Sequence, residues 1–155
     1  MTNGETTDRR ELSEEAADAY RARREALHAA VATLEHELAT LEAADEPDAE
    51  RFSAALHQLL ATLHEHIEQA DAPDGLLSQI IETAPWFAPR AEQLRDEHAD
   101  LVDHANAMIE RLDAGESVAV LLADARSLSD RVSDHRHRGT TLLLDAYMLD
   151  VPAGD

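Results

Sequence analysis

The chain has 155 residues, of which 33 are acidic and 13 basic, so its formal net charge is −20 with histidine neutral. This length suits one compact domain, and a hydrophobic content of 44% excludes the class of highly charged disordered chains. Because cysteine is absent, any metal must be held by histidine and carboxylate, and neither disulfides nor thiol nucleophiles are available. The negative charge disfavours nucleic acid and anionic membranes as partners. The chain contains no long apolar run and no signal-peptide segment, so we expect a cytoplasmic protein.

The first predicted helix spans residues 12–41, a stretch without glycine or proline. Its apolar residues recur at steps of seven, four and three, which places them on one face of an α-helix. They are Tyr20, Leu27, Val31, Leu34, Leu38 and Leu41. Residues 45–48 predict the first turn, because a proline stands there among acidic residues. A second helix over 52–70 has its own apolar face and ends at residues 71–75, which include Pro73 and Gly75.

A short apolar segment over residues 76–83 predicts a further helical piece, followed by Pro85-Trp-Phe-Ala-Pro89. We expect this proline-flanked segment to cover one end of the core, with Trp86 as a buried plug. The third long helix is predicted over 90–112 and the fourth over 117–149, since each carries apolar residues at helical spacing. Between them, residues 113–116 predict a tight connection with a glycine just after the helix end.

Four amphipathic helices joined by short loops predict an all-α protein, and no alternating strand pattern competes with this interpretation. The expected architecture is an up-down-up-down antiparallel four-helix bundle with a short capping helix between the second and third helices. We expect a disordered N-terminus over residues 1–10, the bundle domain over 11–150 and a tail over 151–155.

The chain has 9 histidines, a large share when aromatic residues make up only 3%. Histidine is the commonest nitrogen ligand for metals, so the positions of these residues bear on function. The apolar stripes place His66, His98 and His135 on the buried faces of the second, third and fourth helices. On the first helix, His28 lies about 100° from Leu27, at the edge of the buried face.

These four histidines are also predicted to lie at a common height in the bundle. His28 precedes the first turn, taken at position 46, by 18 residues, and His66 follows it by 20. His98 precedes the third turn, taken at position 115, by 17 residues, and His135 follows it by 20. Because both turns lie at the same end of an antiparallel bundle, all four residues are expected roughly 25 to 30 Å from that end. One layer would then hold one histidine from each helix.

A layer of inward histidines is chemically costly without partners. Each unpaired imidazole costs roughly 1 to 3 kcal/mol, and charging several of them in a core is worse because burial and repulsion depress their pKa values. A metal ion accepts the lone pairs of neutral imidazoles and relieves that cost. The alternative is a structural polar layer in which the histidines hydrogen-bond to neighbours.

The motifs around these histidines resemble a known family. They are His64-Glu-His-Ile-Glu68 on the second helix, Asp96-Glu-His98 on the third and Asp134-His-Arg-His-Arg-Gly139 on the fourth. Together they resemble the hemerythrin-like, HHE cation-binding domain over about residues 20–150. The resemblance implies a four-helix bundle around a non-haem di-iron centre that binds dioxygen or senses oxygen or iron. It also implies that His28, His98 and His135 are the metal ligands on the first, third and fourth helices.

The second helix offers two choices of ligand. His64 with Glu68 satisfies the H-x-x-x-E spacing of the family, whereas His66 satisfies the inward face of the helix. Both His64 and Glu68 look inward only if the helix turns away from its leucines. We therefore expect His66 to be the ligand and assign Glu68 a secondary place.

The carboxylates that bridge the two irons in this family are replaced here. Gly139 stands four residues after His135, and Ala70 stands four residues after His66. Asp71, five residues after His66, matches an H-x-x-x-x-D spacing, although on the second helix instead of the fourth. An oxygen-bridged iron pair requires hard carboxylate ligands, so Asp71 joins Glu68 as a secondary candidate.

Three interpretations of the histidine layer remain open. The first is a metal site, with non-haem iron, mononuclear or dinuclear, as the expected ion and zinc as another. The second is haem, ligated by one or two of these histidines in the room beside Gly139 and Ala70. The third is a bundle that has lost its metal and acts as an interaction module. We expect a metal-binding or sensing protein, with a metal ion or small gas ligand as its partner, in preference to an enzyme.

Overall fold

The computed structural model describes the backbone of residues 2–150 and the side chains of residues 14–15 and 18–146. In chain order the helices are α1 (Thr2–Ala43), α2 (Ala49–Asp71), α3 (Leu76–Thr83), the short 3-10 helix η1 (Pro85–Phe87), α4 (Ala88–Asp113) and α5 (Val118–Asp150). Residues 2–150 contain no strand. The predicted all-α class and the predicted helix order are confirmed, and the ends of the helices after α1 lie within a few residues of the expected positions.

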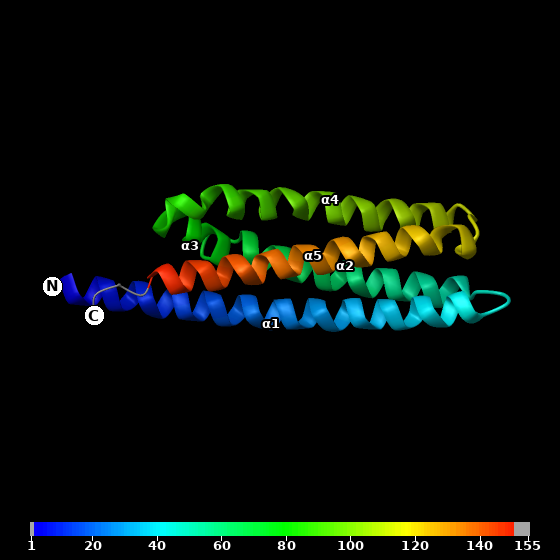
Figure 1. Cartoon of the computed structure of the whole chain (residues 1–155), viewed down its shortest axis with the longest axis horizontal. Coiled ribbons are helices and arrows are strands. Elements are labelled where there is room, and N and C mark those ends of the chain that lie inside the picture. Colours follow the sequence, from blue (N-terminus) through cyan, green and yellow to red (C-terminus); the bar gives the residue numbers. More distant parts are fainter. Residues whose placement is uncertain (1, 151–155) are drawn as a thin grey trace.

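The four long helices form the predicted up-and-down bundle (Figure 1). Helix α1 packs against α2 and α5, and α4 packs against the same two helices, so α1 and α4 lie on one diagonal. The α1–α2 and α4–α5 turns lie at one end of the bundle (Figure 1). At the other end, α3 contacts both α2 and α4 and carries the chain between them. With this connection the long helices lie side by side, so residues at equal distances from the turns stay at the same height. The position of the site depends on this.

Local signals explain where the helices begin and end. The Asp48 side chain caps α2 by accepting hydrogen bonds from the backbone N–H groups of Glu50 and Arg51 at 3.0 and 3.3 Å. After α4, Gly115 adopts φ 93°, a conformation that side chains rarely allow. Its N–H donates to the Leu112 carbonyl oxygen at 3.0 Å, and this closes the helix before α5 begins.

The N-terminal segment, the tail and the cap each stand differently relative to the described residues. Helix α1 begins at Thr2, so its backbone includes most of the segment 1–10 that was expected to be disordered. The expected tail, 151–155, lies outside the described residues. The prediction for the cap was wrong in one detail: Trp86 is 62% exposed, and its neighbour Phe87 is the buried plug. A 3-10 turn directs these adjacent side chains to different sides.

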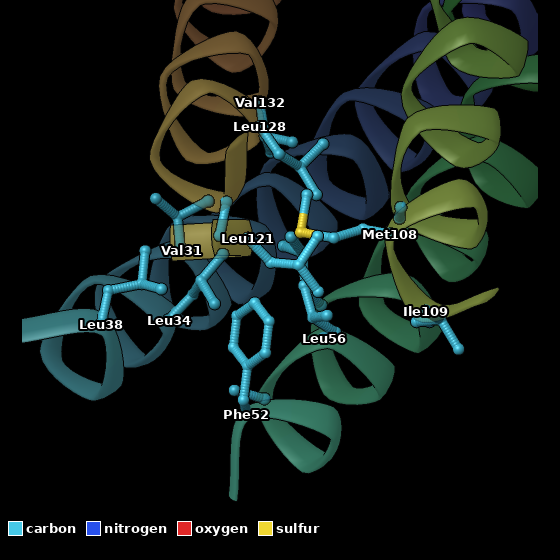
Figure 2. Close-up of a cluster of buried hydrophobic side chains, with 14 of the residues drawn as sticks. Val31, Leu34, Leu38, Phe52, Leu56, Met108, Ile109, Leu121, Leu128 and Val132 are labelled. Atoms are coloured by element: carbon cyan, nitrogen blue, oxygen red, sulfur yellow. The ribbon is translucent and has the colours of Figure 1, made fainter. Parts of the chain in front are cut away.

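The core consists of two apolar clusters that lie one beyond the other along the bundle. The first, which we call the turn-end cluster, runs from the two turns up to Leu63, Leu101 and Val132. Figure 2 shows part of it, with Leu56, Met108 and Leu121 from three helices pointing toward one another. The second, which we call the cap-end cluster, begins at Ala70, Leu94 and Leu142 and continues to the cap. Burial of these side chains supplies the main stabilising free energy of the bundle.

No helix among the described residues is long and apolar enough to cross a membrane.

The acidic surface predicts that salt stabilises the fold. With a net charge of −20, mutual repulsion of surface carboxylates opposes the compact state, and salt screens it. We expect the melting temperature to rise when KCl is increased from about 0.05 M to about 1 M, where the Debye length falls to about 3 Å. Thermal melting followed by circular dichroism at constant pH measures this. A melting temperature that falls with salt would mean that the exposed ion pairs contribute more than the net repulsion.

Candidate metal centre

Three histidines from three helices lie buried between the two apolar clusters. His66 of α2, His98 of α4 and His135 of α5 are 0%, 3% and 1% exposed. On each helix the histidine stands at the core position that separates the turn-end cluster from the cap-end cluster. The helical stripe therefore continues through the histidines, and the bundle directs their side chains inward at one height. The predicted convergence of these three residues is confirmed.

The three rings face one another closely and edge to face. Ring centroids are 4.9 Å apart for His98 and His135, 5.5 Å for His66 and His98, and 5.7 Å for His66 and His135. The planes make angles of 65° to 89°, so none of the rings are stacked face to face. One nitrogen from each ring lies within 4.8 Å of one nitrogen from each of the other two. The nitrogens thus converge on a shared point.

Carboxylates fix the orientation of two of the rings from outside the cluster. Nδ1 of His98 lies 3.0 Å from Oδ2 of Asp71, and Nδ1 of His135 lies 3.0 Å from Oε1 of Glu97. An ionised carboxylate only accepts hydrogen bonds, so each Nδ1 carries the hydrogen and donates it. In the neutral imidazole, the lone pair is then on Nε2. A carboxylate behind a histidine is the arrangement that orients imidazole ligands in metal proteins.

Both carboxylates are in turn held by arginines. Arg138 donates two hydrogen bonds to Glu97, and Nε of Arg95 lies 3.5 Å from Oδ1 of Asp71. Burial raises the pKa of Glu97, but the hydrogen bonds from Arg138 and His135 outweigh it and leave this pKa below its usual value. Glu97 is therefore ionised at neutral pH and accepts the His135 hydrogen.

His66 has no such support and is held neutral by its surroundings. Neither of its ring nitrogens has a hydrogen-bond partner, and Nε2 of His98 is also unpartnered. Burial, followed by repulsion from His135 and His98, lowers the pKa of His66 to about 3. Burial also lowers the pKa of His135, against the opposing effect of Glu97. At neutral pH both of these imidazoles are uncharged, as metal ligands must be.

The cluster fits a single transition-metal ion. Three neutral imidazole nitrogens are a donor set used by zinc in proteins, with nitrogen–metal distances of about 2.0 to 2.1 Å. Around a tetrahedral ion such nitrogens lie about 3.4 Å apart. In this structure the three nitrogens lie within 4.8 Å of one another. Binding such an ion would require the rings to rotate so that the three nitrogens approach one another. An ion would also engage two of the three buried nitrogens that otherwise have no partner, Nε2 of His98 and one nitrogen of His66, since each ring offers one donor.

The fourth predicted histidine does not join this group. His28 is exposed on α1, and the group of possible ligands found among the described residues consists of the other three. Leu27, beside it in the sequence, is 0% exposed and occupies the core position. A residue 100° away on the helix is turned toward solvent when its neighbour points at the bundle axis. His28 was expected at the edge of the buried face, level with the other three histidines, but it lies on the exposed side of α1, outside the layer, for this reason.

The two secondary carboxylates also lie outside the cluster. Glu68 is exposed on α2, as the angle of its helical face indicated. Asp71 is half-buried and contacts Nδ1 of His98, so it supports a ligand from behind. Among the described residues no carboxylate belongs to the group of converging donors. The donor set therefore lacks the bridging oxygens that a di-iron centre requires.

Helix α1 contributes a tyrosine of the cap-end cluster next to this layer, where a histidine was expected. Tyr20 is 2% exposed, and its ring centroid lies 5.5 Å from that of His66. A Cβ added at Gly139 would lie 2.0 Å from the Tyr20 hydroxyl, so the missing side chain of this glycine makes space for the phenol. Burial raises the pKa of Tyr20 to about 12, although Arg24 opposes the shift. The room beside Gly139, on which the haem interpretation relied, is filled by Tyr20.

Comparison of the chain with models of known protein families, with curated proteins and with solved structures found no match.

Proposed function

We propose that this protein binds one divalent transition-metal ion through His66, His98 and His135. The observation that carries the proposal is the convergence of three buried imidazoles from three helices, with nitrogens within 4.8 Å of one another. A core that needed only to be filled would place leucine at these positions, as it does one turn away at Leu63 and Leu101. The ring of His66, with neither nitrogen partnered, is costly in a core unless it has a ligand to bind.

The donors favour zinc over a di-iron centre. Imidazole suits zinc and its neighbours in the first transition row, whereas a bridged iron pair depends on carboxylates. The carboxylates close to the cluster, Asp71 and Glu97, both contact Nδ1 atoms and complete a carboxylate–histidine arrangement on the outer side. The hemerythrin-like resemblance is then one of architecture and histidine placement, with a mononuclear centre in place of the iron pair.

Metal retention by histidine variants tests this proposal. The metal-stripped chain, loaded with Zn²⁺ and passed over a desalting column, should retain one equivalent per chain by elemental analysis. His66→Gln, His98→Gln and His135→Gln should each lose it, because each removes one of three donors.

Neighbouring histidines supply matched controls on the same helices. His64 and His137 are exposed and lie two residues from His66 and His135. H64Q and H137Q should keep the full equivalent of zinc. Retention of zinc by H66Q, or its loss from H64Q, would contradict the proposed site. A wild-type chain that retains no metal from Zn²⁺ or from Fe²⁺ would leave a structural polar layer as the role of the histidines.

A further inference from the structure

We propose that the Tyr20 hydroxyl oxygen is the fourth donor to the ion held by His66, His98 and His135. This inference rests on the proposed metal function and extends it to a residue on α1. The site would then consist of four residues, one from each of the four long helices.

The position of Tyr20 in the layer is the first reason. Its ring centroid lies 5.5 Å from that of His66, the same separation as between His66 and His98. The phenol ring is therefore as close to His66 as the ring of His98 is. It also covers the side that faces α1, where His28 supplies no ligand because it is exposed.

The packing of the Tyr20 hydroxyl against Gly139 is the second reason. Gly139 lies one helical turn after His135 on the same face of α5. Even a methyl group at this position would lie 2.0 Å from the Tyr20 hydroxyl oxygen, a distance that no real contact allows. Glycine inside a helix costs about 1 kcal/mol relative to alanine, so its presence in the middle of α5 has a packing reason. That reason is to make room for the phenol oxygen against α5, one turn beyond His135.

Charge balance is the third reason. Three neutral imidazoles leave the full double charge of the ion inside the core, and burying charge without compensation is costly. Asp71 and Glu97 offset little of it, because Arg95 lies 3.5 Å from the first and Arg138 binds the second. A phenolate would reduce the net charge of the centre by one.

A cation also lies near Tyr20. The guanidinium of Arg24, one turn after Tyr20 on α1, donates to the Thr140 hydroxyl at 3.1 Å and is thereby fixed to α5 next to Gly139. When the ion binds, the phenol O–H bond breaks, the proton passes to solvent and an oxygen–metal bond forms. No electron is transferred, so the step needs no other reactant.

Zinc titration followed by ultraviolet difference spectroscopy tests the inference. Zn²⁺ does not absorb in this range, so a tyrosinate difference spectrum that saturates at one equivalent reports ionised tyrosine alone. The chain has 2 tyrosines, Tyr20 and Tyr147. We expect the signal in the wild type and in Tyr147→Phe, and its loss in Tyr20→Phe. In Y20F the zinc dissociation constant, measured by competition with a chromophoric chelator, should rise by about 10- to 100-fold.

A second variant distinguishes loss of the oxygen donor in Y20F from a change in packing caused by that substitution. Gly139→Ala keeps all four side chains of the layer but displaces the hydroxyl, and it should also abolish the tyrosinate spectrum while zinc remains bound by the histidines. Zinc binding that depends on the histidines, without a tyrosinate spectrum in the wild type, would overturn the inference and leave the proposed function intact. Failure of the wild type to bind zinc at all would remove both.

Discussion

Zn²⁺ at about one hundred times its dissociation constant should stabilise the folded chain by about 2.7 kcal/mol. For a protein of this size, each kcal/mol raises the melting temperature by about 2 to 4 °C, so a rise of about 5 to 11 °C is expected. The physical reason is that His66, His98 and His135 meet only in the folded bundle. An ion that binds all three joins α2, α4 and α5, and the unfolded chain offers no equivalent site.

The control for this prediction must separate the site from the acidic surface. A net charge of −20 attracts any divalent cation, and screening alone gives some stabilisation. Mg²⁺ screens in the same way but prefers oxygen ligands, so the same concentration of Mg²⁺ should give a much smaller shift. H98Q should reduce the zinc shift to the magnesium value, whereas H137Q should not. Equal shifts for wild type and H98Q would show that zinc acts elsewhere on the chain.

The sequence was sufficient to predict the bundle and three members of the layer. Heptad-like steps through His66, His98 and His135 placed them on apolar faces, and counting from the turns placed them at one height. Both inferences depend only on helix geometry, which is the same in every bundle. Helix geometry does not identify the ion or partner that these residues bind, so metal binding remains a prediction.

The first helix shows where such counting fails. His28 met the height criterion but lies beside the buried stripe, and a single helical step turned it to solvent. Tyr20 lay on the stripe itself, seven residues before Leu27, and its phenol reaches the layer. A signal for it existed in Gly139, the glycine in the middle of α5. The sequence showed that Gly139 left room, but only packing shows which side chain fills that room.

The cap illustrates a second limit of periodicity. Trp86 and Phe87 are adjacent aromatic residues between two prolines, and no helical stripe extends over them. Either ring was chemically suitable as the plug. The choice of Phe87 depends on how the 3-10 helix packs against α3 and α4. Such a segment has no period from which a buried face can be counted.

Replacing His66 with leucine should make the metal-free protein more resistant to acid while abolishing zinc binding. His66 ionises in the unfolded chain with a pKa near 6.5, but in the fold this pKa is about 3. Between these values the unfolded chain binds a proton that the folded chain does not, so the wild-type free energy of unfolding falls as pH falls. One such group contributes about 1.4 kcal/mol per pH unit in this window.

The difference between the two proteins isolates this one residue. His98, His135 and Tyr20 surround His66, and they and the outer carboxylates remain in His66→Leu. We expect the stability advantage of H66L over the metal-free wild type to grow by about 2 to 3 kcal/mol between pH 6.5 and 4.5, measured by urea unfolding at each pH. His64→Leu, at an exposed position, should leave the pH dependence unchanged.

The same variant distinguishes a binding layer from a structural one. If the histidines stabilised the core through their own contacts, H66L would unfold more easily at every pH, because the contacts of the ring would be lost. If the layer is kept for an ion, leucine fits a position flanked by the apolar clusters and removes two buried nitrogens that have no partner. The metal-free variant should then be at least as stable as the wild type at pH 7.5, and added Zn²⁺ should reverse the order by stabilising the wild type alone. A variant that is less stable without metal, with the pH dependence of the wild type, would contradict both the neutral state assigned to His66 and the ligand role proposed for it.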